Sequence, residues 1–121
     1  MNDNAVRNRL FFQAMVEGLE QEMTRDERVF CLGEDVGKMG GVFQSTAGLQ
    51  QKFGSDRVMD TPISETGLMG VALGAAVEGL RPVVELMFVD FMGVCFGQIM
   101  NEISKVSYMS GGNVSVPLVI T

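Results

Sequence analysis

A carboxylate, Glu65, stands where the chain passes from a short apolar run into a segment rich in small residues. The run Arg57-Val58-Met59 is typical of a strand, and Asp60-Thr61-Pro62-Ile63-Ser64-Glu65-Thr66-Gly67 leads from it into a helix. Ligands of open α/β sheets bind outside the carboxyl ends of the strands, so Glu65 is a candidate for acid–base chemistry there. The alternative is that Glu65 only complements the helix dipole, which is worth ~0.3–1 kcal/mol on a surface.

The start of that helix has two possible registers. Pro62 favours extended geometry at Thr61. Ser64 can then cap the helix and leave Glu65 at its first position. Alternatively, Thr61 is the cap and Pro62 occupies the first helical position.

Other groups that carry chemistry are few. The chain has no histidine, which excludes His-based metal sites and Ser-His triads. Cys31 and Cys95 lie in apolar settings without CxxC spacing, so both are expected to be reduced core residues of a cytosolic protein. The loop 33–41 contains four glycines but matches neither a phosphate loop nor a dinucleotide fingerprint. Its acidic pair, Glu34 and Asp35, can border a site at the same sheet edge as Glu65, or belong to a flexible loop without a role.

Composition narrows the class of protein. With 121 residues, 46% hydrophobic and 20% charged, the chain is expected to form one globular domain. A net charge of −6 argues against a nucleic-acid partner, because phosphate binding needs clustered Lys and Arg. The sequence contains no apolar run of about 18 residues, so no membrane span is expected. Met1-Asn2-Asp3-Asn4 lacks the order of a signal peptide, and a cytoplasmic location is expected.

The order of periodic segments predicts the fold class. Apolar spacing predicts helices over 10–23, 45–53, 65–79 and 91–108, with Ser45 and Asp90 as caps of the second and fourth. Apolar runs predict strands at 29–32, 58–59, 83–88 and 116–120. Strands that alternate with helices indicate an α/β fold of three layers, a mainly parallel sheet with helices on both faces.

The helix after Glu65 has an unusual composition. Gly67, Gly70 and Gly74 lie inside it, and each costs roughly 1 kcal/mol relative to Ala. We therefore expect its backbone to lie close against another element, either centrally in the fold or at a subunit interface. The last predicted strand leaves an open sheet edge, which invites association, so the chain is expected to be truncated or completed by a partner.

Four stretches together resemble a known family. They are Gly33-Glu34-Asp35-Val36, Asp60-Thr61-Pro62-Ile63-Ser64-Glu65, Gly79-Leu80-Arg81-Pro82-Val83-Val84-Glu85 and Tyr108-Met109-Ser110-Gly111-Gly112. In this order and spacing they resemble the β subunit of the E1 component of thiamine-diphosphate-dependent 2-oxo acid and acetoin dehydrogenase complexes. The resemblance covers about residue 10 to the end, and the stretch 85–96 is most similar to acetoin dehydrogenase members.

The resemblance implies a domain and a set of site residues. Residues 1–121 would be the N-terminal part of a pyrimidine-binding, transketolase-like domain, whose downstream part and C-terminal domain are absent. Glu65 matches the glutamate that hydrogen-bonds N1′ of the cofactor's aminopyrimidine ring and so activates the cofactor. Phe91 matches the aromatic that stacks on the pyrimidine, and Ile63 would add apolar contact; packing alone is the alternative for both. Tyr108 and the loop 110–112 would at most border the site.

The resemblance also implies partners. An E1 α subunit would hold the diphosphate and its Mg²⁺ through a GDG-type motif, which this chain lacks, so no metal ligand is assigned. Further β copies and an E2 core would complete the complex. The family's downstream active-site histidine is missing here, and Thr121 stands where members usually carry Arg.

Two functions follow as hypotheses. In the first, the chain is an E1 β subunit or its N-terminal fragment, acting in acetoin cleavage or in oxidative decarboxylation of a 2-oxo acid. Whether the chain alone is an enzyme stays open in this hypothesis. In the second, it is a truncated, non-enzymatic α/β module that works as a homo-oligomer or interaction domain.

Overall fold

The fold is a parallel sheet of four strands, described by a computed structural model that covers residues 8–121. The expectation about Met1–Asn4 concerns residues outside this range. The strands β1 (Val29–Gly33), β2 (Val58–Asp60), β3 (Arg81–Glu85) and β4 (Val119–Ile120) lie in the order β2-β1-β3-β4. All three neighbouring pairs are parallel, so every strand ends at the same edge of the sheet.

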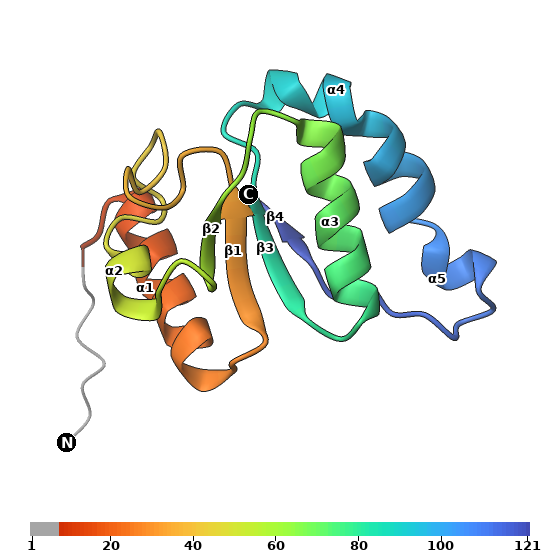
Figure 1. Cartoon of the computed structure of the whole chain (residues 1–121), viewed down its shortest axis with the longest axis horizontal. Coiled ribbons are helices and arrows are strands. Elements are labelled where there is room, and N and C mark those ends of the chain that lie inside the picture. Colours follow the sequence, from red (N-terminus) through yellow and green to blue (C-terminus); the bar gives the residue numbers. More distant parts are fainter. Residues whose placement is uncertain (1–7) are drawn as a thin grey trace.

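Helices cover both faces of the sheet, as predicted (Figure 1). On one side lie α1 (Phe11–Arg25) and α2 (Leu49–Phe53). On the other side lie α3 (Glu65–Val77), α4 (Met92–Gly97) and the π-helical turn η2 (Gln98–Ile103). The predicted three-layer α/β architecture is therefore confirmed.

Two apolar clusters hold the layers together, because alternate strand residues point to opposite faces. Phe30, Leu32 and Val84 pack with Leu68, Met69 and Ala72 of α3 and with Cys95 of α4. Cys31, Val29 and Val58 pack with Met23 of α1 and Leu49 of α2. Both cysteines are free and buried, as expected, and burial raises the pKa of the Cys31 thiol to about 12.

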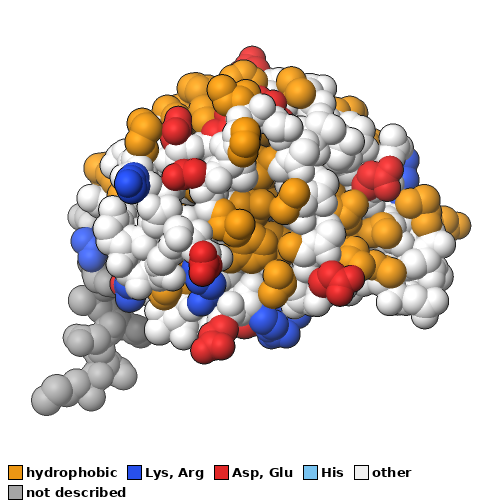
Figure 2. Space-filling view, in the orientation of Figure 1, with side chains coloured by type: hydrophobic (Ala, Val, Ile, Leu, Met, Phe, Trp, Pro, Cys, Tyr) orange, Lys and Arg blue, Asp and Glu red, His pale blue; other side chains and the backbone are white. Residues whose placement is uncertain are grey.

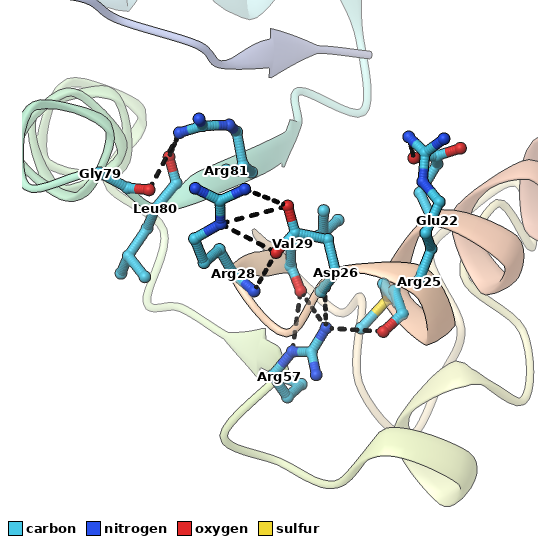
Figure 3. A network of polar contacts seen from close by, with 10 residues as sticks. Glu22, Arg25, Asp26, Arg28, Val29, Arg57, Gly79, Leu80 and Arg81 are labelled. Carbon is cyan, nitrogen blue, oxygen red and sulfur yellow. Dashed lines mark hydrogen bonds and ion pairs between the residues drawn. The ribbon is translucent and has the colours of Figure 1, made fainter.

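Arg57 joins three segments at the amino edge of the sheet, opposite to where the strands end (Figure 3). Its guanidinium donates to the carbonyl oxygens of Met23, Asp26 and Val29, at 3.1 Å for the first two and 2.8 Å from Nε to the third. Beside it, Arg28 pairs with the Asp26 carboxylate at 2.7 Å. Through its side-chain and backbone hydrogen bonds, Arg28 lowers the pKa of Asp26. These contacts close the turn between α1 and β1.

Two predicted helices differ from the observed ones. The helix expected to begin at Ser45 begins only at Leu49, because the Ser45 side chain donates to Glu85 and does not cap a helix. The helix expected over 91–108 is broken into η1 (Val89–Phe91), α4, η2 and α5 (Val106–Met109). Asp90 lies inside the 3₁₀ turn η1 and caps nothing there. The third and fourth strands are shorter than expected, since β3 ends at Glu85 and β4 comprises only Val119–Ile120.

The glycine-rich helix α3 packs on the sheet, on α4 and on η2, and its remaining face is exposed. Leu68, Met69 and Ala72 are buried against the sheet. Gly70 and Gly74 are exposed, and a Cβ built on either would meet nothing within 4 Å. The expectation of a central helix with closely packed glycines is thus wrong within the described chain. Figure 2 shows hydrophobic side chains gathered on the face between α2 and α3. Met59, Val71 and Leu80 are exposed and line one cavity of about 290 Å³.

No helix among residues 8–121 is both long and apolar enough to cross a membrane.

Candidate functional site

The carboxyl edge of the sheet gathers the candidate residues. Gly33, the last residue of β1, is in register with Asp60 of β2 on one side and with Glu85 of β3 on the other. The segments that follow these strands therefore leave the sheet side by side, with Glu34 after β1 and Ile63 to Glu65 after β2. This edge is the position at which open α/β sheets bind ligands.

Glu65 is the first residue of α3, and Ser64 is its N-cap. The Ser64 register is therefore confirmed, whereas the Thr61 and Pro62 register is wrong, although the Ser64 hydroxyl makes no capping hydrogen bond. Glu65 is only 9% exposed. Within residues 8–121, no group donates a hydrogen bond to its carboxylate, so both oxygens can accept one from a ligand.

The beginnings of α3 and α4 lie next to each other. Thr66 Oγ1, in the first turn of α3, donates to the carbonyl oxygen of Val94 in α4 at 3.0 Å. Cys95 is buried in α4, and its pKa is raised by burial and by the charge of Glu65. Phe91 is the N-cap of α4 and packs against the cluster that contains Leu68 of α3, so Glu65 and Phe91 lie at one corner, at the same end of the paired helices.

Phe91 is held by a row of aromatic rings. It packs partly buried against the α3 side of the core. Phe88 meets it edge to face, with ring centroids 5.6 Å apart and planes at 80°. Phe43, from the loop after β1, meets Phe88 in the same way at 5.5 Å and 74°. Such pairs contribute about 0.5–1.5 kcal/mol beyond their burial, so the row orients Phe91.

Ile63 lies on the segment between β2 and α3 and is 83% exposed. A large aliphatic side chain so exposed at this edge is available for contact with a ligand or another chain. Five cavities of about 290 to 610 Å³ open on the surface of the described residues, and none of them is lined by Glu65, Ile63 or Phe91.

The 34–48 loop (residues 34–48) borders this corner. Glu34 is 8% exposed, and its Oε1 accepts a hydrogen bond from the Ser64 N–H at 3.3 Å. The Gly37 N–H donates to Asp60 Oδ1 at 2.6 Å, which ties the loop to the end of β2. Asp35 turns outward in the left-handed region, with φ 59°. Of the predicted acidic pair, the structure thus places Glu34 beside Glu65 and directs Asp35 to solvent.

Sequence reasoning missed Glu85 and Ser45. Ser45 Oγ donates to Glu85 Oε1 at 2.6 Å, while Glu85 Oε2 is buried and has no hydrogen-bond partner among the described residues. Burial raises the pKa of Glu85, partly offset by the Ser45 hydrogen bond. The signal in the sequence was a charged residue inside the apolar run 83–88. Thr121, which departs from the expected Arg, lines the same cavity of about 610 Å³ as Glu85.

Tyr108 and the loop 110–112 lie away from this edge. Figure 1 shows α5 at the outer edge of the molecule, beyond α3 and η2, whereas α3 and α4 begin near the carboxyl ends of the strands. Tyr108 is 89% exposed there. Among residues 8–121, no group of three or more acidic or cysteine side chains is arranged to hold a metal ion.

Comparison with known proteins gives a family match over nearly the whole described chain. Residues 10–121 match the family described as the transketolase pyrimidine-binding domain. The chain is 47% identical to the β subunit of 2-oxoisovalerate dehydrogenase from Bacillus subtilis, over 91% of its own length. It is 50% identical to a chloroplastic pyruvate dehydrogenase E1 β subunit from Arabidopsis thaliana, over 92% of its length. It is also 50% identical to the β subunit of an acetoin:2,6-dichlorophenolindophenol oxidoreductase from Cupriavidus necator, over 88%.

The chain spans about a third or less of the curated relatives it matches: 34% of the bacterial proteins and 27% of the plant protein. The three names give three different substrates at nearly equal identity. The similarity to acetoin-oxidising members is therefore not stronger than the similarity to the others, and the substrate is unresolved.

Proposed function

This chain belongs to the transketolase pyrimidine-binding domain family, and from that premise we propose that it forms the pyrimidine-binding half of a thiamine diphosphate site in an E1 β subunit. The single observation that carries the proposal is Glu65. Its carboxylate is 9% exposed, receives no hydrogen bond from residues 8–121, and lies at the carboxyl edge where such sheets bind ligands.

The side chains at this corner fit the chemistry of an aminopyrimidine. Such a ring has polar nitrogens on its rim and two flat faces. Glu65 offers unused acceptor oxygens for the rim, whereas Phe91 and Ile63 offer an aromatic and an aliphatic surface for the faces. No group among residues 8–121 competes for the Glu65 oxygens, which supports this fit.

In this proposal the residues of the chain bind, orient and exchange a proton. Thiamine diphosphate, when bound, supplies a carbon nucleophile and an electron sink for cleavage next to a carbonyl group. Glu65 forms a hydrogen bond to the ring and exchanges a proton with it at a carboxyl oxygen. Phe91 fixes the plane of the ring, and the Phe88 and Phe43 rings behind it keep Phe91 in place.

The wider assignment is also a proposal. We propose that an E1 α subunit carries the diphosphate and Mg²⁺, that further β copies and an E2 core complete the assembly, and that the protein acts in the cytoplasm. The names of the relatives as β subunits support the α partner. The reaction is oxidative decarboxylation of a 2-oxo acid or cleavage of acetoin. The residues 1–121 would then be the first part of the pyrimidine-binding domain.

A non-enzymatic module is the second candidate. The exposed stripe on α3, with Gly70, Val71 and Gly74, favours it because this surface needs a covering chain whether or not a cofactor binds. In that case the chain would associate with itself and Glu65 would serve only the helix dipole.

Glu65→Gln tests the proposed role. The amide keeps the shape of the side chain and removes the exchangeable proton, so we expect turnover of the assembled E1 to fall at least about 100-fold. Folding should change little, because the lost dipole interaction is worth about 0.3–1 kcal/mol. Steady-state turnover of the assembly with each of the three candidate substrates measures the effect.

Glu78→Gln is the matched control, because Glu78 follows the other end of the same helix and is exposed. It should turn over like the parent. Near-normal turnover of the Glu65→Gln assembly would show that the assigned role is wrong. Calorimetric titration of the chain alone with thiamine diphosphate and Mg²⁺ should show weak binding, and tight binding would contradict a site shared between two subunits.

A further inference from the structure

Glu85 and Ser45 form a buried polar pair that the proposed chemistry does not use. Glu85 is 9% exposed and Ser45 is 5% exposed, and their hydrogen bond of 2.6 Å joins the end of β3 to the 34–48 loop. Val83 of the same strand packs on the α1 side, so the two-residue spacing places Glu85 on that face as well. The pair is therefore separated from the corner of Glu65 and Phe91 by the sheet.

The backbone around Glu85 is shaped to admit its carboxylate. A Cβ on Gly41 would lie 2.8 Å from Glu85 Oε2, 2.9 Å from Oε1 and 2.7 Å from Ser45 Oγ. Gly41 has φ +80°, a conformation in which side chains are strained. A Cβ on Gly33 would lie 2.9 Å from the Glu85 carbonyl oxygen. Two glycines and a serine thus make room for a carboxylate that is costly to bury, because its Oε2 has no partner among residues 8–121.

The 34–48 loop connects this pair to the candidate site by two routes. At its beginning, Glu34 accepts the Ser64 N–H at the start of α3, next to Glu65. Near its middle, Phe43 packs against Phe88, which packs against Phe91. Internal hydrogen bonds make the loop one unit: Thr46 Oγ1 donates to the Val36 carbonyl at 2.7 Å, and the Gly41 N–H donates to the Asp35 carbonyl at 2.9 Å.

We propose that Glu85 is a positioning residue, which anchors the 34–48 loop through Ser45 and thereby holds Glu34 against the start of α3 and Phe43 behind Phe88 and Phe91. The inference rests on the proposed function for its effect on a cofactor, but its structural part does not. Asp60 supplies a second anchor at Gly37. The loop is therefore fixed by carboxylates at the ends of the two strands that flank β1, and its own carboxylate fixes the helix that carries Glu65.

Amide hydrogen exchange of Ser64 tests the anchoring in the full chain. Neither Ser45 nor Glu85 contacts Ser64, so a change there reports transmission through the loop. We expect Ser45→Ala to speed Ser64 exchange by about tenfold relative to the Leu32 amide of the central strand, because one hydrogen bond no longer restrains the loop. Gly41→Ala should have the same effect, since its Cβ displaces the carboxylate while both polar groups remain.

Two further variants separate anchoring from loss of charge and from general destabilisation. Glu85→Gln retains an oxygen that accepts from Ser45, so Ser64 exchange should stay at the parent rate. Arg57→Met removes hydrogen bonds at the opposite edge of the sheet, so it should speed Ser64 and Leu32 equally. Unchanged Ser64 exchange in Ser45→Ala, or equal acceleration of Ser64 and Leu32 in that variant, would overturn the anchoring.

Cofactor kinetics of the assembled E1 test the consequence. With the Ser45→Ala chain, we expect the KM for thiamine diphosphate to rise about tenfold, while kcat at saturating cofactor changes by less than about threefold. An unchanged KM in a chain whose Ser64 exchange is accelerated would overturn the positioning role. If the proposed function is wrong, the result is different: the Glu65→Gln assembly keeps the turnover of the parent, independently of the results for Ser45→Ala.

Discussion

Replacing Glu85 by Gln should stabilise the protein at neutral and alkaline pH but not at acid pH. Burial raises the pKa of Glu85 above the value that it has in the unfolded chain. Below the unfolded pKa of about 4.3, the carboxyl is protonated in both states and costs little. As the pH rises through the folded pKa, the buried group becomes charged and the stability of the parent falls. Gln remains neutral throughout and keeps the acceptor oxygen that Ser45 uses.

The structure sets the size of the effect. Glu85 is 9% exposed and its Oε2 has no partner among residues 8–121. Burying a charged acceptor without a hydrogen bond costs about 1–3 kcal/mol. The Gln variant removes only part of this cost, because the N–H groups of its amide are also buried without partners. We therefore expect a gain of about 1–2 kcal/mol in the free energy of unfolding at pH 8. In a domain of this length, that corresponds to an increase in Tm of roughly 3–10 °C.

Urea unfolding followed by circular dichroism, at several values of pH between 4 and 8, measures the difference between the variant and its parent. Other carboxylates titrate equally in both proteins, so the difference isolates Glu85. Glu27→Gln is the control, since Glu27 is exposed in the turn before β1; its difference from the parent should not change with pH. A Glu85→Gln difference that is constant over this range, or that is largest at pH 4, would refute the reasoning.

Two other substitutions test the fold and the uncovered helix face. Arg57→Met should lower the free energy of unfolding by at least about 3 kcal/mol, because the guanidinium donates hydrogen bonds to three backbone carbonyl oxygens. Urea unfolding measures the loss, and a loss below about 1 kcal/mol would contradict the role given to Arg57. Val71→Glu should leave the unfolding free energy within about 0.5 kcal/mol of the parent, since Val71 is 60% exposed. In sedimentation velocity we expect the parent chain to associate and the Val71→Glu chain to remain a monomer. A parent chain that sediments as a monomer would contradict this expectation.

The local pattern of the sequence was sufficient for the order of elements near the site. Short apolar runs predicted β1 and β2, and helical spacing predicted α1 and α3. These signals are local, because an element with one buried face has apolar residues at the spacing of its own helix or strand. Ser64 as the cap before Glu65 was one of two registers, and the structure selected it.

Predictions failed where a distant residue decides the local conformation. Ser45 has a side chain that often caps helices. Its hydroxyl instead donates a hydrogen bond to Glu85, forty residues further along the chain, and α2 begins only at Leu49. The stretch after β3 has a helical apolar stripe, yet it folds as a 3₁₀ turn, a short α-helix and a π turn, for which we have no physical account. The glycines of α3 predicted close packing, whereas this chain leaves Gly70 and Gly74 exposed.

The sequence by itself determined the family, through four motifs, and it singled out Glu65 in one of them as the candidate residue, because Glu65 is a carboxylate at a strand-to-helix turn. Only the tertiary structure decided what surrounds it. The parallel register brings the ends of β1, β2 and β3 to one edge, so that Glu34 reaches the start of α3 and Phe43 backs the aromatic row of Phe91. The same register buries Glu85 against Ser45. Such pairings depend on how strands far apart in the chain align, and no local period of the sequence encodes that alignment.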